Sequence, residues 1–109
     1  MSKLKKYLKG ETIAAEGEKA RGLFILVDGK IGIFKGGKKV AEFDKEGTIV
    51  GEMSLILKKE RTASIVALED SKLLAVEGQI DDIIKLYPDI TKKILVSLAE
   101  RLAKSTENI

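Results

Sequence analysis

The sequence predicts an α+β fold, a jelly-roll β-barrel with short flanking helices and a long C-terminal dimerisation helix. Over residues 10–77, short apolar or alternating runs are separated by glycine turns every eight to twelve residues or so, about the spacing of small barrels and jelly rolls. After Gly78 the apolar residues recur with the period of a helix. We expect one domain over residues 1–109, which buries roughly two-thirds of its unfolded surface.

The strands follow from the turns between them. Asp28-Gly29 is a strong two-residue hairpin signal and predicts that residues 23–27 and 30–35 are paired strands. Gly36-Gly37 forms the next turn, and residues 38–43 form the next strand. The remaining predicted turns are Glu16-Gly17, Glu46-Gly47, Glu69-Asp70 and Glu77-Gly78.

Two helices are expected after the barrel. Residues 79–86 form a short helix, Tyr87-Pro88 ends it, and Asp89 caps a long helix over residues 89–106. At 100° per residue, the apolar side chains of the long helix cover an arc of roughly 240°, although one amphipathic contact needs only about 100°. The wider arc predicts a second buried face, against the same helix of another subunit, and hence a homodimer. Four residues are expected to be solvated on the remaining arc: Glu100, Arg101, Lys104 and Glu107.

The composition excludes most catalytic chemistry. The chain has no Cys and no His, which supply most ligands of zinc, iron-sulfur, haem and copper sites, so we expect no metal and no cofactor. Thiol and Ser-His-Asp nucleophiles are absent for the same reason. A cupin-like enzyme would share the jelly roll, but cupins bind their metal through histidines. The prediction is a protein without enzymatic activity.

The charge pattern indicates a solvated surface. The net charge is +3, but the lysines alternate with acidic residues, and three Phe and two Tyr are the only aromatic residues available for stacking on bases. We therefore expect no specific nucleic acid as a partner. The sequence has no run of 18 apolar residues and no cleavable leader, which predicts a cytoplasmic protein without membrane contact.

Residues 51–67 (GEMSLILKKERTASIVA) have the residue types of a buried anion site. Gly51 allows the backbone to approach a ligand, and residues 53–57 can form one or two helical turns with free N–H groups. Arg61 is expected to open a buried strand, where it needs an acidic partner and is suited to bidentate recognition of a phosphate. The alternative is an ordinary helix-to-strand connection in which Glu52 and Arg61 pair at the surface.

The same segment resembles the phosphate-binding cassette of the cyclic nucleotide-binding domain, the family that includes the catabolite activator protein and the regulatory subunits of the cAMP-dependent kinase. Residues 51–55 match the first part of the cassette, and residues 61–63 match the second. Val50 replaces the usual aromatic residue, Ser54 a usual alanine and Glu60 a common proline. Glu60 also puts a negative charge beside the expected anion site.

The resemblance implies a role for each matching residue. Arg61 would pair with the phosphate oxygens, the N–H groups of residues 52–54 would surround the same group, and Glu52 would accept a hydrogen bond from the ribose 2′-OH. Residues 101–107 resemble the helix segment of the catabolite activator protein whose Thr-Ser pair reaches the adenine, one residue from each subunit. The alternative for Ser105 and Thr106 is that they are polar residues at a fraying helix end. The expected ligand-binding residues are Gly51, Glu52, Met53, Ser54, Arg61, Thr62, Ala63, Ser105 and Thr106.

The resemblance predicts a cyclic nucleotide sensor that acts as a homodimer, without a DNA-binding domain, and signals through a separate effector protein. The expected ligand is cAMP, with cGMP still open because the Thr62 hydroxyl suits either a guanine amino group or the phosphate. The alternative is a degenerate barrel that binds no nucleotide and serves for dimerisation or protein docking, for which Val50 and Glu60 are the arguments.

Overall fold

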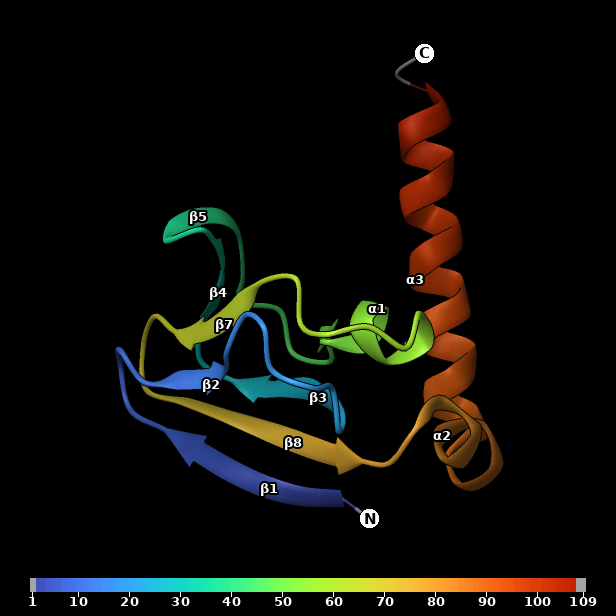
Figure 1. Ribbon diagram of the computed structural model, residues 1–109, viewed down its shortest axis with the longest axis horizontal. Coiled ribbons are helices and arrows are strands. Elements are labelled where there is room, and N and C mark those ends of the chain that lie inside the picture. Colours follow the sequence, from blue (N-terminus) through green and yellow to red (C-terminus); the bar gives the residue numbers. More distant parts are fainter. Residues whose placement is uncertain (1, 108–109) are drawn as a thin grey trace.

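Two four-stranded antiparallel sheets form one side of the molecule in the computed structural model, which describes residues 2–107 and the side chains of residues 2–105. The strand orders are β1-β8-β3-β6 and β2-β7-β4-β5. Figure 1 shows the strands on one side and the long helix α3 on the other. The strands are β1 (Ser2–Tyr7), β2 (Thr12–Ala14), β3 (Gly22–Asp28), β4 (Ile31–Lys35), β5 (Lys38–Phe43), β6 (Ile49–Val50), β7 (Ser64–Ala67) and β8 (Ser71–Glu77).

The predicted fold class is confirmed, with an open rather than a closed barrel. No strand ladder among the described residues joins the two sheets, so they form an open jelly roll. The turn at Asp28-Gly29 connects β3 to β4, as predicted. Gly29 has a φ of 102°, and a Cβ at this position would lie 2.2 Å from Ser71 Oγ, so only glycine fits against β8 here.

Strand β1 extends the first sheet beyond the range that the sequence predicted. It pairs with β8 along its whole length, from Ser2 opposite Val76 to Tyr7 opposite Ser71. The run of lysines in β1 has low strand propensity, and its partner strand is far away in the sequence, so no local pattern revealed it. Lysine is nevertheless favourable on an edge strand because it discourages pairing with other chains. The strand region therefore begins at Ser2 rather than near residue 10.

The apolar core consists of two clusters on opposite faces of the first sheet. One lies between the two sheets and contains Leu26 of β3 and Leu73 of β8. The other contains Leu23 of β3 and Val76 of β8 and lies beneath the helices α1 (Glu52–Ile56), α2 (Ile80–Leu86) and α3 (Pro88–Glu107). Strands β3 and β8 are thus buried on both faces, and burial of each such side chain contributes about 1.5 to 3 kcal/mol. This packing holds the three helices against the sheet.

Helix α3 begins at Pro88 rather than at a capping Asp89. Proline suits the first position of a helix because its φ is already helical and its missing N–H has no partner there. Ile94 is buried in the second cluster, whereas Leu95, the next residue, is 64% exposed. The described part of this single chain therefore leaves apolar surface of the helix uncovered at Leu95, and the homodimer stays a prediction. None of the described helices has the length and apolar character needed to cross a membrane.

Candidate functional site

The backbone of Gly51 brings the start of helix α1 against Arg61. Gly51 has a φ of 83°, in the left-handed region, and precedes the first residue of the helix. A Cβ at this position would lie 2.7 Å from Arg61 Nη1. Both its conformation and the space available therefore require glycine at residue 51.

Arg61 is a buried cation held by backbone carbonyls. Its exposed fraction is 7%. Its Nη1 donates to the Gly51 carbonyl oxygen at 2.7 Å, and its Nη2 donates to the Gly22 carbonyl oxygen at 2.8 Å. Burial lowers the pKa of Arg61, and the charges of Glu18 and Glu52 act in the opposite direction. A guanidinium has more N–H donors than these two bonds use, so it retains donors for an anion. Arg61 precedes β7 rather than opening that strand.

Glu52 pairs with a residue that the sequence analysis placed in solvent. Its side chain is 6% exposed, and its Oε1 accepts a hydrogen bond from Arg101 Nη2 at 2.9 Å. The expectation that Arg101 is merely solvated is wrong, although 53% of its side chain remains exposed. The alternative of a surface pair between Glu52 and Arg61 is also wrong, since both are buried and Glu52 pairs with Arg101. The ion pair ties α1 to α3.

These groups line a cavity of about 920 Å³, a size near the upper end of the range for small-ligand sites. One wall is apolar and comes from Ile33 of β4 and from Ala41 and Phe43 of β5. The opposite wall is helix α3, which contributes a mixed polar and apolar surface. The α3 residues on the cavity are Lys92, Lys93, Val96, Ser97, Glu100 and Arg101.

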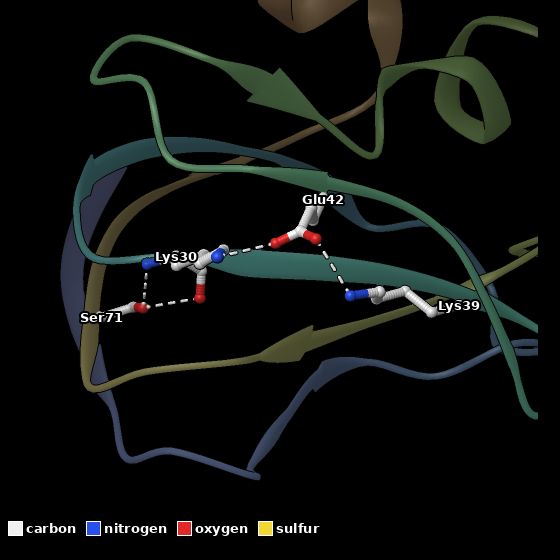
Figure 2. A network of polar contacts seen from close by, with 4 residues as sticks. All are labelled: Lys30, Lys39, Glu42 and Ser71. Carbon is white, nitrogen blue, oxygen red and sulfur yellow. Dashed lines mark hydrogen bonds and ion pairs between the residues drawn. The ribbon is translucent and has the colours of Figure 1, made fainter.

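A polar network fixes the strand that carries the apolar wall. Glu42 of β5 pairs with Lys30 at 2.9 Å and with Lys39 at 3.0 Å (Figure 2). The Lys30 amide N–H donates to Ser71 Oγ at 3.0 Å, so the network continues to the start of β8. The hydrogen bond from Lys30 lowers the pKa of the Glu42 carboxyl. The pair with Lys30 joins the edge strand β5 to the residue before β4, whereas Lys39 lies on β5 itself.

Most of the predicted site residues lie together on this cavity. Those that line it are Gly51, Glu52, Met53, Ser54, Arg61, Thr62 and Ala63. Ser105 is exposed near the end of α3 and is not among the lining residues of the single chain. The side chain of Thr106 lies outside the described residues. The base contacts of these two residues therefore stay a prediction that depends on a second subunit.

The two substitutions that argued for a degenerate barrel leave the cavity intact. Val50 is 5% exposed and packs in the core between the sheets. Glu60 is exposed, forms a backbone bridge with Lys19, and is not among the residues that line the cavity.

Sequence reasoning missed three groups that shape the site: Gly22, Phe24 and Arg101. Gly22 and Phe24 both contact the guanidinium of Arg61 from β3, far away in the sequence. The contact of Arg101 could have been predicted. If Glu52 is buried, its carboxylate needs a cationic partner, and the chain has only three arginines.

Comparison with known proteins agrees with this geometry. A family model described as the cyclic nucleotide-binding domain matches residues 4–85. Among curated proteins, the Pycsar effector protein XpPycTIR of Xanthomonas perforans is 33% identical over 97 residues, which are 87% of this chain and 32% of that protein. The cyclic AMP receptor protein of Thermus thermophilus is 31% identical over 104 residues, which are 91% of this chain and 48% of that protein. The chain thus spans about half or less of the length of these relatives.

Solved structures give the same result. The catabolite activator protein of Thermus thermophilus superposes with a TM-score of 0.79 and 30% identity, over 98% of this chain and 53% of that one. The cAMP-bound structure of PfPKA-R (141–441) superposes with a TM-score of 0.76 and 30% identity, over 94% of this chain and 35% of that one. The sequence, the jelly roll and the cavity between the cassette and α3 agree, and the chain belongs to the cyclic nucleotide-binding domain family.

Proposed function

We propose that this domain binds cAMP in the cavity between the cassette and α3, as a regulatory module without catalytic activity. The observation that carries the proposal is the buried Arg61, a residue that lines the cavity and whose guanidinium keeps N–H donors beyond those bonded to Gly51 and Gly22. The cyclic phosphate has one negative charge, and a single desolvated arginine matches that charge and its planar geometry. The N–H groups of residues 52–54 would complete the contact.

Glu52 would bind the ribose. One of its carboxylate oxygens accepts a hydrogen bond from Arg101, and the carboxylate has further lone pairs for the 2′-OH. The apolar wall of Ala41 and Phe43 would then face the base, with Val96 of α3 on the opposite side. In a homodimer through the uncovered face of α3, Ser105 and Thr106 would reach the base across the subunit boundary.

The proposed regulation is a shift in the population of α3 positions. A ligand that contacts the cassette and Glu52 also acts on the ion pair between Glu52 and Arg101, and hence on the placement of α3. A separate effector protein would read that change. Two relatives support cAMP as the ligand by their names, the cyclic AMP receptor protein and the cAMP-bound PfPKA-R. Other relatives are cyclic nucleotide-gated channels and a cGMP-dependent protein kinase, which keeps cGMP as the second candidate.

Calorimetric titration with a panel of nucleotides tests the proposal. The panel consists of cAMP, cGMP, cCMP, cUMP and linear AMP. We expect saturable binding of cAMP, weaker binding of the other cyclic nucleotides, and the weakest binding for AMP, whose phosphate carries more charge and is not constrained in a ring. Preference for another cyclic nucleotide would replace cAMP and leave the site in place. No binding of any member up to millimolar concentration would reject the proposal in favour of a docking module.

A further inference from the structure

We propose that Phe24 is a positioning residue, whose ring, together with the Gly22 carbonyl, holds the guanidinium of Arg61 in its binding orientation before any ligand arrives. The consequence for affinity rests on the proposed function. The effect on the Arg61 side chain itself does not.

The contacts around Arg61 come from two separate segments. Gly51, at the start of the cassette, accepts one hydrogen bond from its guanidinium, and Gly22, at the start of β3, accepts another. The Cζ atom of Arg61 lies 5.8 Å from the centroid of the Phe24 ring, within the roughly 6 Å over which a guanidinium and an aromatic face attract each other. The three contacts come from Gly51, Gly22 and Phe24, and together they restrict a long, flexible side chain.

The position of Phe24 differs from that of an ordinary core aromatic. It packs at the margin of the cluster between the sheets and is only partly buried. A Cβ on Gly51 would lie 3.6 Å from Phe24 Cδ2, so the ring lies beneath both the first residue of the cassette and the guanidinium. Phe24 therefore supports the two groups that meet the proposed phosphate.

Early fixation of Arg61 has a physical benefit. A free arginine side chain loses much conformational freedom when it binds a ligand, and this loss weakens binding unless the side chain is ordered beforehand. The ring also offers a favourable environment to a cation that burial destabilises, as the lowered pKa of Arg61 indicates. A leucine at residue 24 would preserve apolar burial but would lose the aromatic face.

The test compares Phe24→Leu with Phe24→Tyr, which keeps the ring, and with Phe34→Leu as a matched control. Phe34 is another partly buried phenylalanine on a strand, and it does not line the cavity. The first readout is the NMR signal of the Arg61 Nε–H group in the ligand-free protein. The chain has only three arginines, so the signal is assigned from its loss in Arg61→Lys. We expect faster solvent exchange and a shifted, averaged signal in Phe24→Leu only.

The second readout is affinity for the nucleotide that binds best in the panel. Phe24→Leu should weaken it about 3- to 30-fold, in keeping with the strength of cation–π contacts. The affinities of Phe24→Tyr and Phe34→Leu should stay within about twofold of the parent. In a protein that already carries Arg61→Ala, adding Phe24→Leu should not lower the affinity further. An unchanged Arg61 signal in Phe24→Leu, or an equal loss in Phe34→Leu, would overturn the inference. If the parent binds no nucleotide, the proposed function fails, and the Arg61 signal still decides the role of Phe24.

Discussion

Replacement of Arg101 by methionine should destabilise the fold through Glu52, a residue on a different helix. The substitution keeps an apolar stem of similar length and removes the charge that pairs with the Glu52 carboxylate at 2.9 Å. Loss of one partner of a fully buried pair costs about 3 to 5 kcal/mol, whereas exposed pairs contribute about 0.2 to 1 kcal/mol. Here Glu52 is 6% exposed and Arg101 is 53% exposed. We therefore expect a loss of about 1 to 2 kcal/mol in the free energy of unfolding.

Urea denaturation at neutral pH measures this loss, with Lys104→Met as the matched control. Lys104 is a cation on the same helix, is exposed, and belongs to none of the ion pairs found among the described residues. Its replacement should change stability by less than about 0.5 kcal/mol. Adding Glu52→Gln to Arg101→Met should recover part of the lost stability, because the amide removes the unpaired buried charge. If Arg101→Met behaves like Lys104→Met, or if Glu52→Gln gives no recovery, the pair does not connect α1 to α3 as described.

Three further predictions concern the cassette, the dimer and the β5 wall. Lys58 has a φ of 55° just after α1, where glycine has no steric penalty, so Lys58→Gly should stabilise the protein by about 0.5 to 1 kcal/mol in urea denaturation; a destabilised variant would show that the lysine side chain has a role of its own. Leu95→Glu should convert the expected dimer to monomer in sedimentation at micromolar concentration, whereas Leu86→Glu, at a similarly exposed residue of α2, should not; a parent protein that sediments as a monomer would remove the dimer. The lowered pKa of Glu42 means that its pairing stabilises the fold above the ordinary carboxyl value of 4.5 and that this contribution is lost as the pH falls through the lowered value. The stability difference between the parent and Glu42→Gln should thus be present at pH 7 and shrink in acid, and a difference that does not depend on pH would contradict the assignment.

Local sequence patterns predicted the strands and the cassette well, for physical reasons. Asp28-Gly29 fixes a hairpin through the backbone conformation that such a turn needs, and Gly51 with Arg61 lies in a segment only 17 residues long. The side chains that hold Arg61 and Glu52 in place could not be predicted from local patterns. Phe24 meets Arg61, and Arg101 meets Glu52, only because the sheet and the helices bring distant segments together.

The strand that the sequence prediction missed also depends on a contact between distant segments. Strand β1 depends on β8 at the other end of the domain, and its lysines hide the strand from propensity arguments. The predicted start of α3 was wrong for a local reason. Pro88 was expected only to end the preceding helix, but a proline also suits the first position of a helix, and α3 begins there. The wide apolar arc on α3 leaves Leu95 64% exposed in one chain, and the second subunit that this arc predicts stays a prediction.

The most direct test of the account is the affinity of Arg61→Ala for cAMP, measured by calorimetry beside the parent. Arg61 is buried and would face the only formal charge of the ligand, so we expect a loss of about 2 to 4 kcal/mol, roughly 30- to 1,000-fold in affinity. Arg61→Lys should also bind poorly, because a point charge does not reproduce a two-pronged contact. Circular dichroism should show that each variant keeps its fold. An Arg61→Ala variant that binds cAMP as tightly as the parent would contradict the central claim.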